Sequence, residues 1–200
     1  MTEGRFDRLL AACLHQGILE LLPQRLDFYE HWLGSSGLRG GNIGPAPMLA
    51  VLGFLRTEGE AYERVVTRAG QLAAGWTVAS MPGLRRRAIA VLPRPLRVRA
   101  AMRVTARIAR IISGGGRVSA QVRRGGARLD VKTSPFCAVR ERHATPLCGF
   151  YAAVATETLG AFGLSATSRL ERCRAVNGSS CVVTVETAGA GAAPDPAIAA

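Results

Sequence analysis

Aromatic residues and lysine are scarce in this sequence, and each scarcity narrows what the protein can be. Phe, Trp and Tyr make up 6% of the 200 residues, too few to supply the exposed stacking rings of a platform for single-stranded nucleic acid. Lys132 is the single lysine, so the formal net charge of +12 comes almost entirely from arginine. A basic chain can attract nucleic acid, anionic lipid or carboxylate-bearing ligands, and its charge alone does not choose among them.

Long hydrophobic runs are also missing. No segment approaches the ~20 consecutive apolar residues of a membrane helix, and residues 1–7 are charged, without the apolar core and cleavage site of a signal peptide. We therefore expect a cytoplasmic protein with no membrane span. In that setting the five cysteines are expected to be thiols or metal ligands before disulfides: Cys13, Cys137, Cys148, Cys173 and Cys181.

Familiar catalytic and nucleotide-binding motifs are absent too. The sequence contains neither a Gly-rich dinucleotide fingerprint nor a phosphate loop, and no triad of nucleophile, base and orienting acid is evident. Reduction of a substrate usually requires a nicotinamide or flavin cofactor, for which no motif is visible. A binding role is therefore favoured, with the question of an enzyme left open. The arginines are accompanied by no helix-turn-helix or zinc finger, so nucleic acid is not an expected partner.

Helical periodicity is clear through most of the chain. Apolar residues recur at three- and four-residue steps, which predicts helices over residues 5–33 with a break at Pro23, 47–55, 61–78, 95–112 and 146–162. From Leu84 to Arg128 the sequence has no acidic residue. The helix over 95–112 lies within this stretch and is amphipathic, with aliphatic residues on one side and arginines on another.

Two stretches with strand character complete the pattern. A hairpin is predicted over 117–132, and the closing strands 166–175 and 181–185 are joined by a turn at Asn177-Gly178. The expected architecture is α+β, with helices packed on one face of a small antiparallel sheet of about four strands. We divide the chain into an N-terminal helical extension (1–43), a ligand-binding domain (44–187) and a disordered tail (188–200).

Three segments carry the cysteines of the second half of the chain. They read Ser134-Pro135-Phe136-Cys137, then Pro146-Leu147-Cys148-Gly149-Phe150-Tyr151, then Glu171-Arg172-Cys173 followed by a turn and Cys181. In this order and spacing they resemble the four-vinyl-reductase domain family. Its superfamily includes the bacteriochlorophyll 4-vinyl reductase proteins, phenol-sensor input domains and TRAPP small subunits. The resemblance covers roughly 44–185 and implies a TRAPP-subunit-like α+β fold and a homodimer.

Sulfur and carboxylate side chains in these segments predict a zinc site. Zinc takes four such ligands in tetrahedral geometry, and the set expected here is Cys148, Glu171, Cys173 and Cys181. Phenol sensors look similar, but their Glu lies three residues before the first strand cysteine, whereas Glu171 lies two before Cys173. In an extended strand a one-residue shift turns a side chain to the opposite face. The alternative is that these cysteines are small buried core residues.

The function implied by the resemblance is binding of a hydrophobic small molecule, a tetrapyrrole, lipid or aromatic, in the service of bacteriochlorophyll biosynthesis. The pocket is expected between the sheet and the helices over 47–79, 95–112 and 146–162. Arg99 and Arg103 would pair with ligand carboxylates. Two alternatives stay open: a 4-vinyl (8-vinyl) reductase acting on a divinyl chlorophyllide, and a ligand-sensing regulatory or tethering module. The expected apolar lining is Phe136, Leu147, Phe150 and Tyr151.

Overall fold

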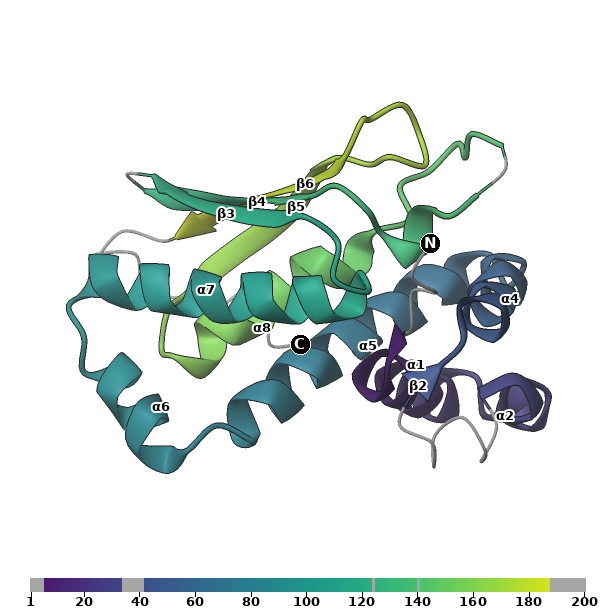
Figure 1. The fold of residues 1–200 in the computed structure, drawn as a ribbon, viewed down its shortest axis with the longest axis horizontal. Helices are drawn as coiled ribbons and strands as arrows, with labels where there is room; N and C mark the ends of the chain where they lie inside the picture. The colour runs from purple at the N-terminus through teal and green to yellow at the C-terminus, as the bar shows by residue number, and fades with distance from the viewer. Residues whose placement is uncertain (1–5, 34–41, 124, 140, 188–200) are drawn as a thin grey trace, which may run out of the picture.

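The computed structural model describes residues 6–33, 42–123, 125–139 and 141–187. In this part of the chain, helices pack on one face of a four-stranded antiparallel sheet (Figure 1). The α+β class predicted from the sequence is therefore confirmed. None of the described helices is both long enough and apolar enough to cross a membrane.

The sheet is built from the two predicted strand pairs. Its order is β3-β4-β6-β5, so the closing strand β6 lies between the hairpin and β5, and each neighbouring pair is antiparallel. On β4 alternate residues are buried, which directs one face of this strand toward the helices. The strands are β3 (Val118–Arg123), β4 (Gly126–Val131), β5 (Ala166–Arg172) and β6 (Cys181–Thr187).

Most helices form close to the predicted ranges. Pro23 separates the first two, as expected, because proline lacks the backbone donor that a continuous helix requires. A two-stranded ladder of β1 (Phe6–Asp7) and β2 (Asn42–Ile43) accompanies them. The helices are α1 (Arg8–Leu21), α2 (Leu26–Leu33), α4 (Pro45–Arg56), α5 (Glu60–Ala79), α7 (Arg94–Ile112) and α8 (Gly149–Ala161). The predicted tail 188–200 lies outside the described residues.

One helix was not predicted. α6 (Gly83–Ala90) follows Pro82, where the sequence suggested only the end of the preceding helix. Its sequence contains three consecutive arginines and buries only Ile89, so it has almost no apolar periodicity to detect. In Figure 1 it extends away from the sheet between the end of α5 and the start of α7.

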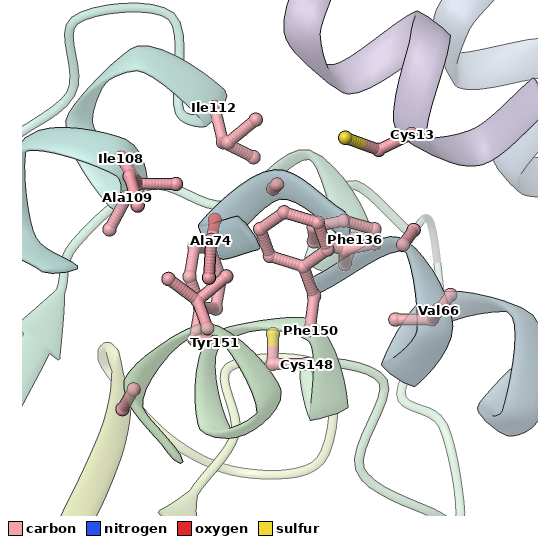
Figure 2. Packing of buried hydrophobic residues seen from close by; sticks show 14 of the residues in the cluster. Cys13, Val66, Ala74, Ile108, Ala109, Ile112, Phe136, Cys148, Phe150 and Tyr151 are labelled. Carbon is pink, nitrogen blue, oxygen red and sulfur yellow. The ribbon is translucent and has the colours of Figure 1, made fainter. Parts of the chain in front are cut away.

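The central element is α8, which packs on α5 on one side and on β5 and β6 on the other. Phe136, Phe150 and Tyr151 form a buried aromatic cluster, with ring centroids 5.0 Å apart for the stacked Phe136–Phe150 pair (Figure 2). The helix ends in a Schellman motif, in which the Leu164 N–H donates to the Leu159 carbonyl. Gly163 takes the left-handed conformation there, with φ of +69°, which glycine adopts without steric cost.

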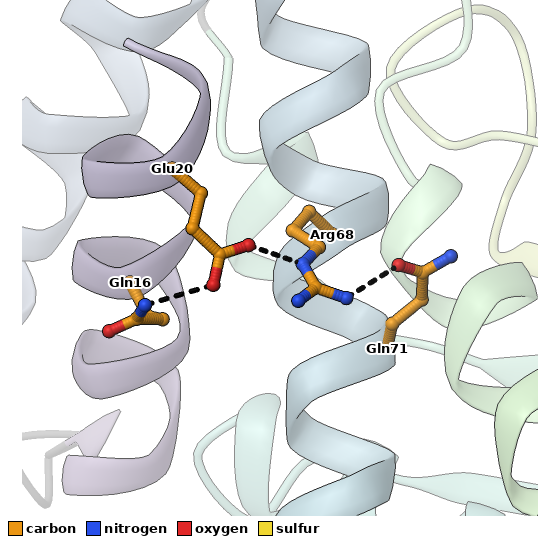
Figure 3. A network of polar contacts seen from close by, with 4 residues as sticks. All are labelled: Gln16, Glu20, Arg68 and Gln71. Atoms are coloured by element: carbon orange, nitrogen blue, oxygen red, sulfur yellow. Dashed lines mark hydrogen bonds and ion pairs between the residues drawn. The ribbon is translucent and has the colours of Figure 1, made fainter. Parts of the chain in front are cut away.

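The N-terminal helix α1 shares the core of the rest of the molecule. It packs against α5, and its residues Leu10, Cys13, Leu14 and Ile18 have no exposed surface. A polar network crosses the outer edge of this contact (Figure 3): Arg68 Nε donates to Glu20 Oε2 at 2.6 Å. The Arg68 hydrogen bond lowers the pKa of Glu20.

Two glycines of α5 should respond in opposite ways to alanine. A Cβ on Gly70 would lie 2.5 Å from the Phe150 carbonyl oxygen of α8, whereas a Cβ on Gly75 would meet nothing within 4 Å. We expect Gly70→Ala to lower the free energy of unfolding by about 1–3 kcal/mol through overpacking. Gly75→Ala should raise it by about 0.5–1 kcal/mol through helix propensity. Urea denaturation of both variants checks this, and equal effects would contradict the close α5–α8 contact.

Candidate metal centre and adjoining cavity

Four cysteine sulfurs lie close together near the start of α8. All four side chains are buried, and their Sγ atoms lie within 4.8 Å of one another. The shortest separations are 2.8 Å between Cys137 and Cys148 and 3.1 Å between Cys148 and Cys181. Cys173 lies 3.4 Å from Cys137. We refer to Cys137, Cys148, Cys173 and Cys181 as the cysteine cluster.

Each cysteine of the cluster is fixed by a different local structure. Cys137 ends the 3-10 turn Pro135–Cys137, and Cys148 is the N-cap residue of α8. Cys181 opens β6, where it pairs with Val131 of β4. Cys173 follows β5 directly. Strand pairing and helix capping therefore bring together residues up to 44 positions apart in the sequence.

A tight turn returns the chain from Cys173 to Cys181. The Cys173 carbonyl accepts backbone N–H groups from Val176, Asn177 and Gly178. A Cβ on Gly178 would lie 2.8 Å from the Ser180 carbonyl oxygen and 3.1 Å from that of Cys173, so this position requires glycine. The Asn-Gly signal in the sequence thus marks the turn that closes the cluster.

The cluster has the composition and size of a tetrahedral thiolate metal site. Four sulfur ligands are characteristic of structural zinc or of iron–sulfur sites, and sulfurs around zinc at ~2.3 Å lie roughly 3.8 Å apart. The hydrogen-bonded sulfur pairs of the cluster are 2.8–3.4 Å apart, so the sulfurs need to move outward only slightly to reach the spacing around zinc. The Leu147 N–H also donates to Cys173 Sγ at 3.4 Å, which stabilises a thiolate there. A zinc ion therefore fits these residues.

Mutual hydrogen bonding divides the four thiols into two kinds. The hydrogen bond with Cys148 lowers the pKa of Cys137 below the ordinary thiol value. The hydrogen bond with Cys137 does the same for the pKa of Cys173. A hydrogen bond with Cys137 raises the pKa of both Cys148 and Cys181. Two of the thiols thus lose their proton more readily than the other two, and a divalent cation would draw protons off all four.

The structure brings together three of the four predicted zinc ligands and places the fourth elsewhere. Glu171 lies at a β-bulge in β5, where the pairing with β6 shifts between Leu170 and Arg172. Its carboxylate is on the surface and pairs with Arg128 at 3.2 Å. Cys137 occupies the cluster in its place. The sequence motif already contained Cys137, but its position before the helix gave no reason to count it as a ligand.

A cavity of about 780 Å³ adjoins the cluster. It lies between α5, α8, β5 and the segment 143–149. Apolar side chains and hydrogen-bonding groups share its wall, together with three carboxylates, one guanidinium and one imidazole. The lining residues are Arg56, Gly59, Glu60, Tyr62, Glu63, Val66, Thr67, Gln71, His143, Thr145, Pro146, Leu147, Gly149, Ala152, Ala153, Thr156, Glu157, Ser168 and Leu170.

The cavity and the cysteine cluster share a wall. Leu147 and Gly149 line the cavity, and Cys148 between them belongs to the cluster. The buried Tyr62 hydroxyl donates to the Leu147 carbonyl at 2.9 Å, while the Leu147 N–H points to Cys173 Sγ. Arg56, which also lines the cavity, donates to the Phe136 carbonyl at 3.1 Å, one residue before Cys137. Any change in metal occupancy would therefore act directly on this wall.

The predicted ligand-binding residues lie in three different places. Leu147 lines the cavity, as expected for a pocket residue. Phe136, Phe150 and Tyr151 are fully buried and pack on one another behind it. Arg99 and Arg103 lie on the exposed side of α7, a helix that contributes no described residue to the cavity lining.

Comparisons with known proteins identify the fold. No protein-family model and no curated protein matches the sequence. Among solved structures, the phenol-responsive sensory domain of the transcription activator PoxR, determined with phenol, has a TM-score of 0.52 and 15% sequence identity, covering 72% of this chain and 75% of that one. An H-NOX protein from S. oneidensis in the Fe(II)NO ligation state has a TM-score of 0.56 and 9% identity, covering 92% of this chain and 100% of that one. The chain therefore shares its overall fold with both of these domains.

The structural similarity to the PoxR domain supports one part of the family resemblance inferred from the cysteine motifs. The likeness to phenol-sensor input domains agrees with the fold shared with the PoxR domain. At these identities the likeness is one of architecture. Membership of the four-vinyl-reductase family and kinship with TRAPP subunits stay predictions from the sequence.

Proposed function

We propose that this protein is a small-molecule-binding module of the sensory type, in which a structural zinc ion in the cysteine cluster supports one wall of the ligand cavity. The observation that carries the proposal is the shared segment Leu147–Gly149, which faces the cavity on either side of the cluster residue Cys148. Zinc would lock the four chain segments together and so hold the cavity open in one shape. Ligand occupancy and metal geometry would then be linked through the same backbone.

The chemistry of the lining supports a largely apolar ligand with one or two hydrogen-bonding groups. The volume falls within the ~300–1,000 Å³ typical of small-molecule sites. Val66, Leu147 and Leu170 offer apolar surface. The Ser168 hydroxyl is buried without a hydrogen-bond partner among the described residues, so a ligand hydroxyl or carbonyl would satisfy it.

A tetrapyrrole of bacteriochlorophyll synthesis is a narrower form of this proposal. Its carboxylates would need cationic partners, and among the described lining residues Arg56 is the only arginine. Glu60, Glu63 and Glu157 would repel such a ligand. We therefore favour a neutral aromatic or lipid-like molecule over a dicarboxylate.

The proposal is tested by occupancy of the cavity. Native mass spectrometry of the purified protein should show a co-purified small molecule, and calorimetry should show binding of at least one neutral probe from phenol, indole and a medium-chain alcohol. Thr156 lines the cavity, so Thr156→Trp should weaken the binding probe by tenfold or more, about 1.4 kcal/mol, by filling the space.

Thr167→Trp is the matched control. Thr167 is also exposed, but it lies on β5 outside the lining, so this variant should bind as the wild type does. An empty protein that binds none of the probes, or equal loss in both variants, would contradict the proposal.

A further inference from the structure

One face of α7 carries a row of four exposed arginines. Arg99, Arg103, Arg107 and Arg110 are all exposed and follow one another at steps of four, four and three residues, so they lie on consecutive turns of one side. We call these four residues the arginine stripe. Figure 1 shows α7 lying along the sheet, with which it makes contacts through β3 and β4.

No described acidic residue pairs with the stripe. The ion pairs of the described residues involve other basic residues, among them Arg25, Arg68, Arg128 and Arg169. The sequence itself offers no local partner, because residues 84–129 contain neither Asp nor Glu. Like charges at a spacing of four residues destabilise a helix. Such a surface is best explained by an anionic partner outside the chain.

Exposed aliphatic residues lie on α6, just after it, and near the start of α7. Leu84 of α6 is 83% exposed and Val91, just after α6, is 80% exposed. Leu96 is 47% exposed and lies three residues before Arg99, at the head of the stripe. Among the described residues, Leu84 and Val91 are the most exposed large hydrophobic side chains. Exposed apolar side chains thus lie on and just after α6, which contacts α7, and at the head of the stripe itself.

We infer that α6 and the arginine stripe form a docking surface for an anionic lipid membrane. Guanidinium groups would bind lipid phosphates, and Leu84 and Val91 would enter the boundary between headgroups and acyl chains. Nucleic acid would use the arginines but would gain nothing from exposed aliphatic residues. The same combination of charge and apolar surface is what interfacial membrane binding requires. This role is separate from the cavity and from the cysteine cluster.

Vesicle sedimentation with the full chain tests the inference. The wild type should bind vesicles of mixed phosphatidylcholine and phosphatidylglycerol, should not bind phosphatidylcholine alone, and should dissociate as salt is raised. Arg103→Gln with Arg107→Gln should lower the partition coefficient on the order of tenfold or more, given the contribution of each basic residue at such a surface. Leu84→Ser with Val91→Ser should lower it several-fold.

Arg8→Gln with Arg64→Gln is the matched control, since it removes the same charge at exposed positions outside α6 and α7. This variant should keep most of the binding. Equal loss in the control, absence of binding to anionic vesicles, or unchanged binding by the Leu84/Val91 variant would overturn the inference. Binding to duplex DNA that is insensitive to the Leu84/Val91 variant, without vesicle binding, would assign the surface to nucleic acid instead.

Discussion

Removal of zinc with a strong chelator is expected to unfold the second half of the protein or to lower its Tm steeply. Binding of structural zinc in small domains contributes about 10–16 kcal/mol, whereas whole domains are stable by only about 5–15 kcal/mol. In this chain the ion would join the 3-10 turn, the start of α8 and both closing strands. Elemental analysis of the purified protein should give one zinc per chain, and calorimetry should follow the loss of stability on chelation.

Substitutions separate the observed ligand set from the one expected from the sequence. Cys137→Ser and Cys148→Ser should each lose zinc, because each removes one of four sulfurs. Glu171→Gln should keep it, since this side chain pairs with Arg128 on the surface. Zinc loss in Glu171→Gln together with retention in Cys137→Ser would restore the ligand set first inferred from the motif.

Cys13→Ala is the control for loss of a buried thiol. Cys13 lies in the core of α1, outside the cysteine cluster. This variant should retain one zinc per chain and lose stability only through the small cavity it leaves. Protein purified without chelators that contains no metal would count against the centre as a whole.

Much of the fold could be predicted from the sequence because its signals are local. Proline interrupts a helix in any surroundings, as Pro23 does here, and an Asn-Gly pair such as Asn177-Gly178 marks a tight turn. The amphipathic pattern of α7 likewise defines its length to within a residue. These features depend on the backbone chemistry of a few neighbouring residues, so tertiary packing altered the predicted helix and turn positions little.

The candidate site depended on non-local contacts, and there the sequence was less informative. Whether Cys137 reaches the cluster depends on the path of the chain between β4 and α8, which no periodicity describes. The bulge at Glu171 arises from pairing between β5 and β6 and decides which way this carboxylate points. The cavity likewise follows from how α5, α8 and β5 diverge, which is a property of packing.

Stability is expected to fall above about pH 9 because a buried thiol and buried tyrosines must remain protonated in the folded state. Burial raises the pKa of Tyr62 and of Tyr151 above the ordinary tyrosine value, and it raises the pKa of Cys13 to about 12. The folded chain therefore holds these protons more tightly than the unfolded chain. Their contribution is fully present below the unfolded pKa, about 9 for Cys13 and about 10 for tyrosine, and is lost as pH rises toward the folded pKa.

The slope of this loss is measurable. Each such group lowers the free energy of unfolding by about 1.4 kcal/mol per pH unit between its two pKa values. Tyr62→Phe should therefore flatten the alkaline slope by about that amount. At neutral pH it should also lose about 1 kcal/mol, because the hydroxyl no longer donates to the Leu147 carbonyl. Urea denaturation at a series of pH values, followed by tryptophan fluorescence, measures both effects. An identical slope in wild type and variant would mean that the Tyr62 hydroxyl is accessible to water, and the wall between cavity and cysteine cluster would then be open to solvent.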